Sequence, residues 1–77
     1  MLPTQKIELK QIVNEGMKNA TLNGYGEFAW HDADAAEVAL DMYDFNAQLE
    51  EFRVKHSLFL DGFLEDVAEL IREIRQE

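Results

Sequence analysis

The feature that most restricts how this chain can fold is a run of mostly apolar residues at alternating steps of three and four, from residue 35 to residue 59. Its members are Ala35, Val38, Met42, Phe45, Leu49, Phe52, His56 and Phe59. Residues three and four apart lie on the same side of an α-helix, and a sustained heptad stripe is typical of a helix packed along another helix. The spacing therefore predicts a mainly α-helical protein.

Two further segments have helical periodicity. Residues 4–20 carry apolar side chains mostly at helical spacing, with Thr4 as the expected N-cap and Gly16 as an interruption or C-cap. The segment that carries the stripe is expected to span 34–55, with Asp32 or Asp34 as its N-cap. A third helix over about 61–75 has a broad apolar face. That face consists of Leu60, Phe63, Leu64, Val67, Leu70, Ile71 and Ile74. We predict a three-helix or helical-hairpin domain that comprises residues 1–77.

The heptad phase slips after Phe59, because Phe63 and Val67 follow it at two successive steps of four. Such a slip marks either a stutter in one long helix or a break between two helices. Residues 55–62 contain a serine and the turn-prone pair Asp-Gly, so we favour a break. A hairpin of the second and third helices, covered by the first, is then expected to bury four aromatic rings together: Phe45, Phe52, Phe59 and Phe63.

Residues 22–31 gather two glycines, three aromatic residues and a histidine, and we expect a loop there. Asn23 and Gly24 are a strong turn signal, so a short β-hairpin over 17–30, followed by two helices, is the alternative. The loop is favoured because Met17 and Ala20 continue the periodicity of the first helix, which leaves Asn23 or Gly24 as its C-cap.

Charge is distributed unevenly along the chain. Residues 1–31 are balanced, and the whole net charge of −9 falls in residues 32–77. Nucleic-acid backbones and anionic membranes attract basic surfaces, so we expect direct binding to neither. Asp34, Glu37, Asp41 and Asp44 repeat at steps of three and four and form a carboxylate stripe beside the apolar one. A partner with a basic surface, or no charged partner at all, is favoured.

Several kinds of chemistry have no support in the residue pattern. The chain has no cysteine, which excludes disulfides and thiolate metal sites. Glu27, His31 and Asp34 share helical spacing, but a metal site needs more convergent ligands. Ser57 is the only serine, and His56 beside it would point about 100° away around a helix. We expect no catalytic residue, no metal and no cofactor.

The expected function is a non-catalytic protein-binding module: a cytoplasmic adaptor, regulator or inhibitor of a larger protein. Because a domain of this size has a limited core, we expect it to act as a homodimer. The expected dimer seam is Val38, Met42, Phe45, Leu49, Phe52, His56 and Phe59. The expected protein-binding residues are Tyr25, Trp30 and His31, at the border of the acidic part, together with Asp34, Glu37, Asp41 and Asp44.

Two alternatives remain. One is a phage or mobile-element inhibitor that mimics nucleic acid and occupies a DNA-binding protein. The other is a metal-dependent helical nucleotide pyrophosphohydrolase, although the paired glutamates of such enzymes, spaced ExxE, do not occur in this sequence.

Overall fold

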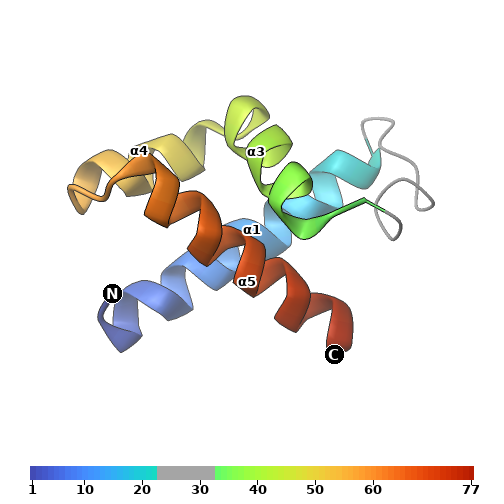
Figure 1. Ribbon diagram of the computed structural model, residues 1–77, viewed down its shortest axis with the longest axis horizontal. Coiled ribbons are helices and arrows are strands. Elements are labelled where there is room, and N and C mark those ends of the chain that lie inside the picture. Colours follow the sequence, from blue (N-terminus) through green and yellow to red (C-terminus); the bar gives the residue numbers. More distant parts are fainter. Residues whose placement is uncertain (23–32) are drawn as a thin grey trace.

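The computed structural model describes residues 1–22 and 33–77, and these residues form helices joined by short connections (Figure 1). The helices are α1 (Pro3–Leu22), α3 (Ala35–Phe45), α4 (Ala47–Lys55) and α5 (Leu60–Gln76). The prediction of a small helical domain is confirmed. The alternative β-hairpin over 17–30 is wrong in its first half, since residues 17–22 are helical. The expected loop and the caps at Asn23 and Gly24 lie outside the described residues.

The described helices pack around one apolar core. In Figure 1, α1 and α5 cross near the middle of the view, and α3 and α4 lie above the crossing. The most extensive packing is between α3 and α5. Every buried side chain in the described ranges is apolar. The core consists of Leu9, Val13, Met17, Ala35, Val38, Ala39, Met42, Leu49, Phe52, Phe63, Val67, Ala68, Leu70 and Ile71.

Helix α5 follows the prediction closely, since it begins one residue before the expected start and ends one residue after the expected end. Phe63, Val67 and Ile71 return to the same side every four residues and are buried against the other helices. Asp61 in the first turn and Arg75 in the last turn have the charges that the helix dipole favours at each end. The Arg75 guanidinium also donates a hydrogen bond to the Ala33 carbonyl, 3.1 Å away, which ties α5 to the segment before α3.

Helix α1 begins at Pro3, so the expected N-cap at Thr4 is wrong. A proline suits the first helical position, because its φ angle is already helical and the N–H that it lacks would have no helical partner there. The Gln5 Oε1 atom accepts a hydrogen bond from the Leu2 N–H at 2.9 Å, which is one half of a capping box.

Gly16 does not end α1, which continues to Leu22. It lies instead where α1 approaches the junction of α3 and α4. A Cβ atom at this position would lie 2.6 Å from Met42 Cε and 2.7 Å from Asn46 Nδ2. The glycine therefore allows a close approach between α1 and that junction.

The predicted single helix over 34–55 is wrong, because the chain breaks at Asn46. This residue is extended, with φ −116° and ψ 100°, and its Oδ1 atom accepts the Gln48 N–H at 2.9 Å. Asparagine is a strong N-cap, so Asn46 ends α3 and starts α4 in a new direction. The N-cap expected at Asp34 is confirmed, since its Oδ1 atom accepts the Ala36 N–H at 2.8 Å.

The break predicted within 55–62 is confirmed: α4 ends at Lys55 and α5 begins at Leu60. Ser57 has φ 53°, in the left-handed region. The Leu58 N–H donates to the Arg53 carbonyl at 3.0 Å and the Ser57 N–H donates to the Val54 carbonyl at 3.1 Å. These two bonds form a Schellman motif, which satisfies the last carbonyls of α4 and turns the chain toward α5.

Candidate functional site

The predicted seam does not form one continuous stripe, because the breaks after Phe45 and Lys55 change the direction of the chain. Its members Val38, Met42, Leu49 and Phe52 lie in the core of a single chain. Phe45 is 75% exposed and Phe59 is 90% exposed. The prediction that four aromatic rings are buried together is therefore wrong. Only Phe52 and Phe63 are buried, with ring centroids 6.1 Å apart.

A second chain cannot reach the four buried seam residues unless the core opens. His56, the remaining seam residue, is half-buried, and its Nδ1 atom lies 3.0 Å from the Gln5 Nε2 atom. Because Gln5 uses its oxygen to cap α1, its amide nitrogen donates this bond and the imidazole accepts it. His56 thus joins the start of α1 to the end of α4. The homodimer expected from the sequence stays a prediction.

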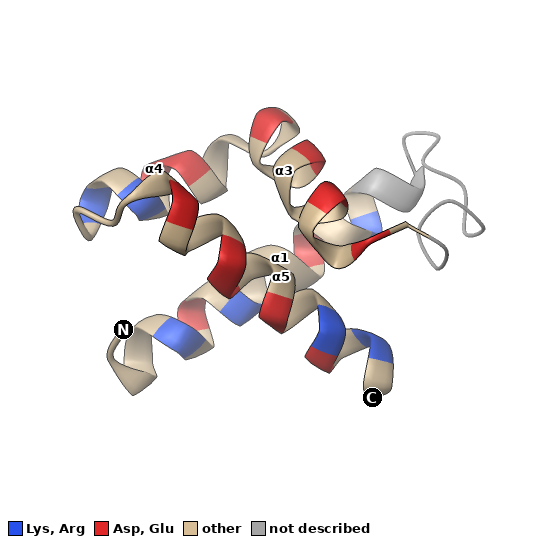
Figure 2. Cartoon of the chain, in the orientation of Figure 1, with Lys and Arg blue, Asp and Glu red and all other residues tan. Residues whose placement is uncertain are grey.

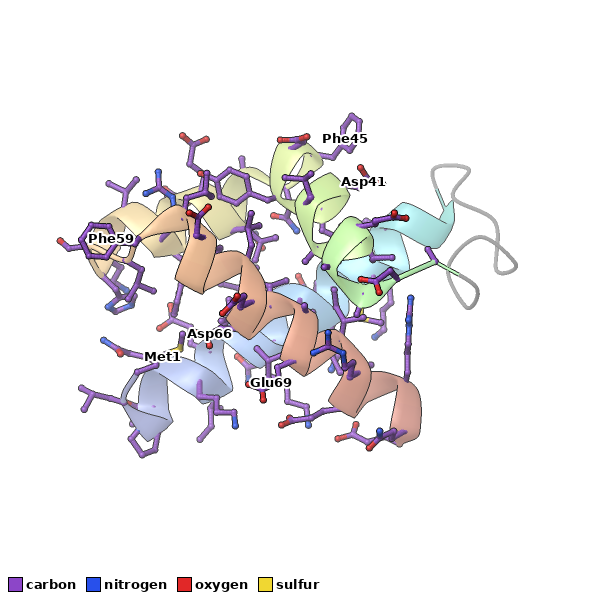
Figure 3. The ribbon with its side chains drawn as sticks, in the orientation of Figure 1. Met1, Asp41, Phe45, Phe59, Asp66 and Glu69 are labelled. Atoms are coloured by element: carbon purple, nitrogen blue, oxygen red, sulfur yellow. The ribbon has the colours of Figure 1, made fainter. Side chains whose placement is uncertain are left out.

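The carboxylate stripe lies on the side of α3 that faces away from the core. The inward face of α3 is apolar and buried, whereas Glu37, Asp41 and Asp44 are exposed on the opposite face beside Asp34. Leu40 lies among them at steps of three and four from Glu37 and Asp44, and it is 48% exposed. Figure 3 shows Asp41 directed away from the body of the molecule. We call this surface the α3 outer face: Asp34, Glu37, Leu40, Asp41 and Asp44.

No acid of the α3 outer face forms an ion pair with a described cation. The ion pairs within the described ranges join Lys6 to Glu73, Lys10 to Glu77 and Lys55 to Glu8. They link α1 to the C-terminal end of the chain and to α4. Figure 2 shows the result, because every charged residue marked on α3 is acidic. No described cation therefore offsets the negative charge of the α3 outer face.

Helix α5 carries further exposed acids that do not share this face. They are Asp61, Glu65, Asp66, Glu69 and Glu73. Figure 3 places Asp66 and Glu69 on the opposite side of the view from Asp41. Exposed acids therefore lie on both helices. On α5, Leu60 is 40% exposed beside Asp61, whereas on the α3 outer face Glu37, Asp41 and Asp44 flank Leu40 on both sides.

The described acids do not converge on a possible metal. Among residues 1–22 and 33–77, no group of three or more histidine, aspartate or glutamate side chains is arranged to hold an ion. Acids at steps of three and four on one exposed helix point outward side by side, which does not give the enclosing geometry that a metal requires. The described helices also include none with the length and hydropathy of a membrane span.

The outcome for the predicted binding residues is mixed. Asp34, Glu37, Asp41 and Asp44 lie together on one exposed face, while Tyr25, Trp30 and His31 fall outside the described residues. Leu40 was missed, although its spacing from Glu37 and Asp44 places it on the acidic side of α3 and away from the apolar stripe.

Comparisons of the chain with protein-family models, curated protein sequences and solved structures gave no match.

Proposed function

We propose that this protein is a small non-catalytic binding module that docks on a basic surface of a larger protein through the α3 outer face. One observation carries the proposal. Four exposed carboxylates without a described cation partner surround a half-exposed leucine on a single helix face.

The arrangement has the two elements that a protein-binding surface needs. Unpaired carboxylates speed the encounter with a basic partner and discriminate against acidic ones. Leu40 supplies apolar area that a partner can cover, with the acids around it as a polar rim. Because the other side of α3 is packed into the core, the outer face is held in place before a partner arrives.

Nucleic-acid mimicry has weaker support than protein binding. From Asp34 to Asp44 the helix rises about 15 Å, and duplex DNA of that length carries about nine phosphates. The α3 outer face has four carboxylates over the same distance. The pyrophosphohydrolase alternative gains no support from the described residues, whose acids form no metal-binding group.

The test compares two variants of equal net charge in affinity capture from a lysate of the source cells. The first variant, Glu37→Gln, Asp41→Asn and Asp44→Asn, neutralises three of the four acids of the α3 outer face and keeps Asp34 as the helix cap. The second, Glu15→Gln, Glu50→Gln and Glu69→Gln, neutralises three exposed acids on the other helices. We expect the wild type and the second variant to retain the same protein, and the first variant to lose it.

The salt dependence and a third variant complete this test. Raising the salt from about 0.1 M to 0.5 M is expected to release the captured protein, because exposed charge pairs are screened. Leu40→Ser is expected to weaken retention without changing the charge. Equal retention by both charge variants, or the same loss in both, would contradict the proposal.

A further inference from the structure

A groove of about 600 Å³ runs between α1 and α4, on a different pair of helices from the α3 outer face. Its lining residues are Glu8, Gln11, Ile12, Gln48, Glu51, Phe52 and Lys55. The residues from α4 recur at steps of three and four, as do those from α1, so each helix gives one continuous wall. The groove is open to solvent along much of its surface.

The two walls are antiparallel and are joined at their ends. At one end, Gln5 is bonded to His56, and Glu8 pairs with Lys55 at 3.7 Å. At the other end, Gly16 allows α1 to lie close to Asn46. The residues of α1 that line the groove, Glu8 to Ile12, cover a rise of about 6 Å along the helix, so the groove is about as long as one extended long side chain.

The groove offers acceptors that the described chain does not use. Glu51 has no ion-pair partner there, and the side-chain amides of Gln11 and Gln48 make no hydrogen bond to a described residue. Glu8 on the opposite wall is not one of these free acceptors, because it pairs with Lys55. Ile12, which is half-buried, supplies apolar surface between the polar groups.

We infer that this groove binds an arginine side chain of a protein partner. A guanidinium group has five N–H donors and no acceptor, and it pairs with carboxylates in a planar, two-point geometry. The carboxylate of Glu51 and the amide oxygens of Gln11 and Gln48 can receive these donors, while the aliphatic stem lies on Ile12. The inference adds a second site and does not depend on the α3 outer face.

The position of Lys55 predicts the direction in which its removal changes the affinity for arginine. Its ammonium group lies at the Glu8 end of the groove and repels an incoming cation. Removing that charge with Lys55→Gln is expected to strengthen arginine binding. Removing the acceptor charge with Glu51→Gln is expected to weaken it about tenfold, the scale of one charge-assisted hydrogen bond.

The experiment is an NMR titration of the full chain with the peptide acetyl-Gly-Arg-Gly-amide. We expect saturable shifts at the Gln11 and Gln48 side-chain amides and at the Glu51 backbone. The matched probe replaces arginine by citrulline, which has nearly the same shape and no charge, and is expected to bind at least tenfold more weakly.

Two charge variants locate the site. Glu51→Gln should weaken binding of the arginine peptide, whereas Asp66→Asn, at an exposed position of α5, should leave its affinity for the groove unchanged. The inference is overturned by non-saturating shifts, by shifts confined to α3, by equal affinity in Glu51→Gln and wild type, or by equal binding of the citrulline peptide. Shifts confined to α3 would overturn the groove inference but not the proposed function. Saturable shifts at the groove would support the inference even if the proposed function failed its own test.

Discussion

The pair α3–α5 and the pair α1–α4 differ in what joins them and in what they leave exposed. Helices α3 and α5 make the most extensive contact in the described fold and contribute most of its buried side chains. Helices α1 and α4 are joined near their ends by Gln5 with His56, Glu8 with Lys55 and the close approach at Gly16. The α3–α5 pair is held by apolar packing, and the acids of α3 form no ion pair with a described residue. The α1–α4 pair is held by polar contacts, which use the charges of Glu8 and Lys55 and lie at the ends of a groove.

The largest expected effect comes from truncating a ring in the well-packed pair. Phe63 is 1% exposed and contacts the rings of Tyr43 and Phe52. Phe63→Ala is expected to lower the free energy of unfolding by about 3–5 kcal/mol, which is enough to unfold so small a domain. Phe59→Ala removes the same atoms from a side chain that is 90% exposed, and it should change the free energy of unfolding by less than about 0.5 kcal/mol. Urea unfolding followed by circular dichroism compares them, and equal stabilities would contradict the assigned core.

A smaller effect is expected at the contact that joins α4 to α3. The Arg53 Nε–H donates to the Tyr43 hydroxyl at 2.9 Å, and the Arg53 guanidinium also donates to the Leu58 carbonyl at 3.2 Å. Arg53→Met should destabilise the protein by about 1–2 kcal/mol, because it removes hydrogen bonds from a charged donor. Arg72→Met, at an exposed position of α5, is the control and should stay within about 0.5 kcal/mol of wild type in the same assay. Similar losses in both variants would show that Arg53 does not join these elements.

Alanine substitutions at two glycines are expected to change the stability of the fold in opposite directions. A Cβ atom at Gly62 meets nothing within 4 Å, so Gly62→Ala should stabilise α5 by about 0.5–1 kcal/mol. At Gly16 the same methyl group displaces Met42 and Asn46, and Asn46 caps α4. We expect Gly16→Ala to lose about 1 kcal/mol overall, because disturbing the cap outweighs the gain in helix propensity. Thermal unfolding of the two variants measures this, and stabilisation by both would contradict the close approach at Gly16.

The smallest expected effect concerns the surface ion pair between Lys10 and Glu77. The hydrogen bond to Glu77 raises the pKa of the Lys10 ammonium, against an opposing effect of desolvation. A raised folded-state pKa stabilises the fold below the unfolded value of about 10.4, and this contribution disappears as the pH rises through the folded value. Wild type should therefore unfold at a slightly higher temperature than Lys10→Gln at pH 8. The gap should close as the pH rises through the raised pKa of Lys10, and a gap that does not depend on pH would contradict this assignment.

Much of the helical content follows from apolar spacing and cap residues alone. Helix α5 is predictable almost to the residue, because its apolar face is wide and its ends carry favourable charges. The start of α3 is predictable from Asp34, and the turn after Lys55 from the slip in phase. Each of these signals comes from residues within the element or within a few residues of its end.

The features that the sequence did not predict depend on contacts between residues distant in sequence or on the direction of one helix relative to the next. The heptad spacing continues across Asn46, because that residue occupies no apolar position of the stripe, so spacing alone does not reveal the break. The role of Gly16 depends on Met42 and Asn46, and the groove depends on the register between α1 and α4. For the candidate site, spacing identified the acids of α3 and also places Leu40 among them, but the extent of its exposure required the structure.

The measurement that tests the central claim most directly is hydrogen exchange of the full chain with and without the captured partner. The account predicts that binding slows exchange of backbone amides in α3, between Glu37 and Phe45, and that this slowing is absent in the variant Glu37→Gln, Asp41→Asn and Asp44→Asn. Slowed exchange that leaves α3 unchanged and appears on other helices would contradict the account, because the α3 outer face would then not be the surface that meets the partner.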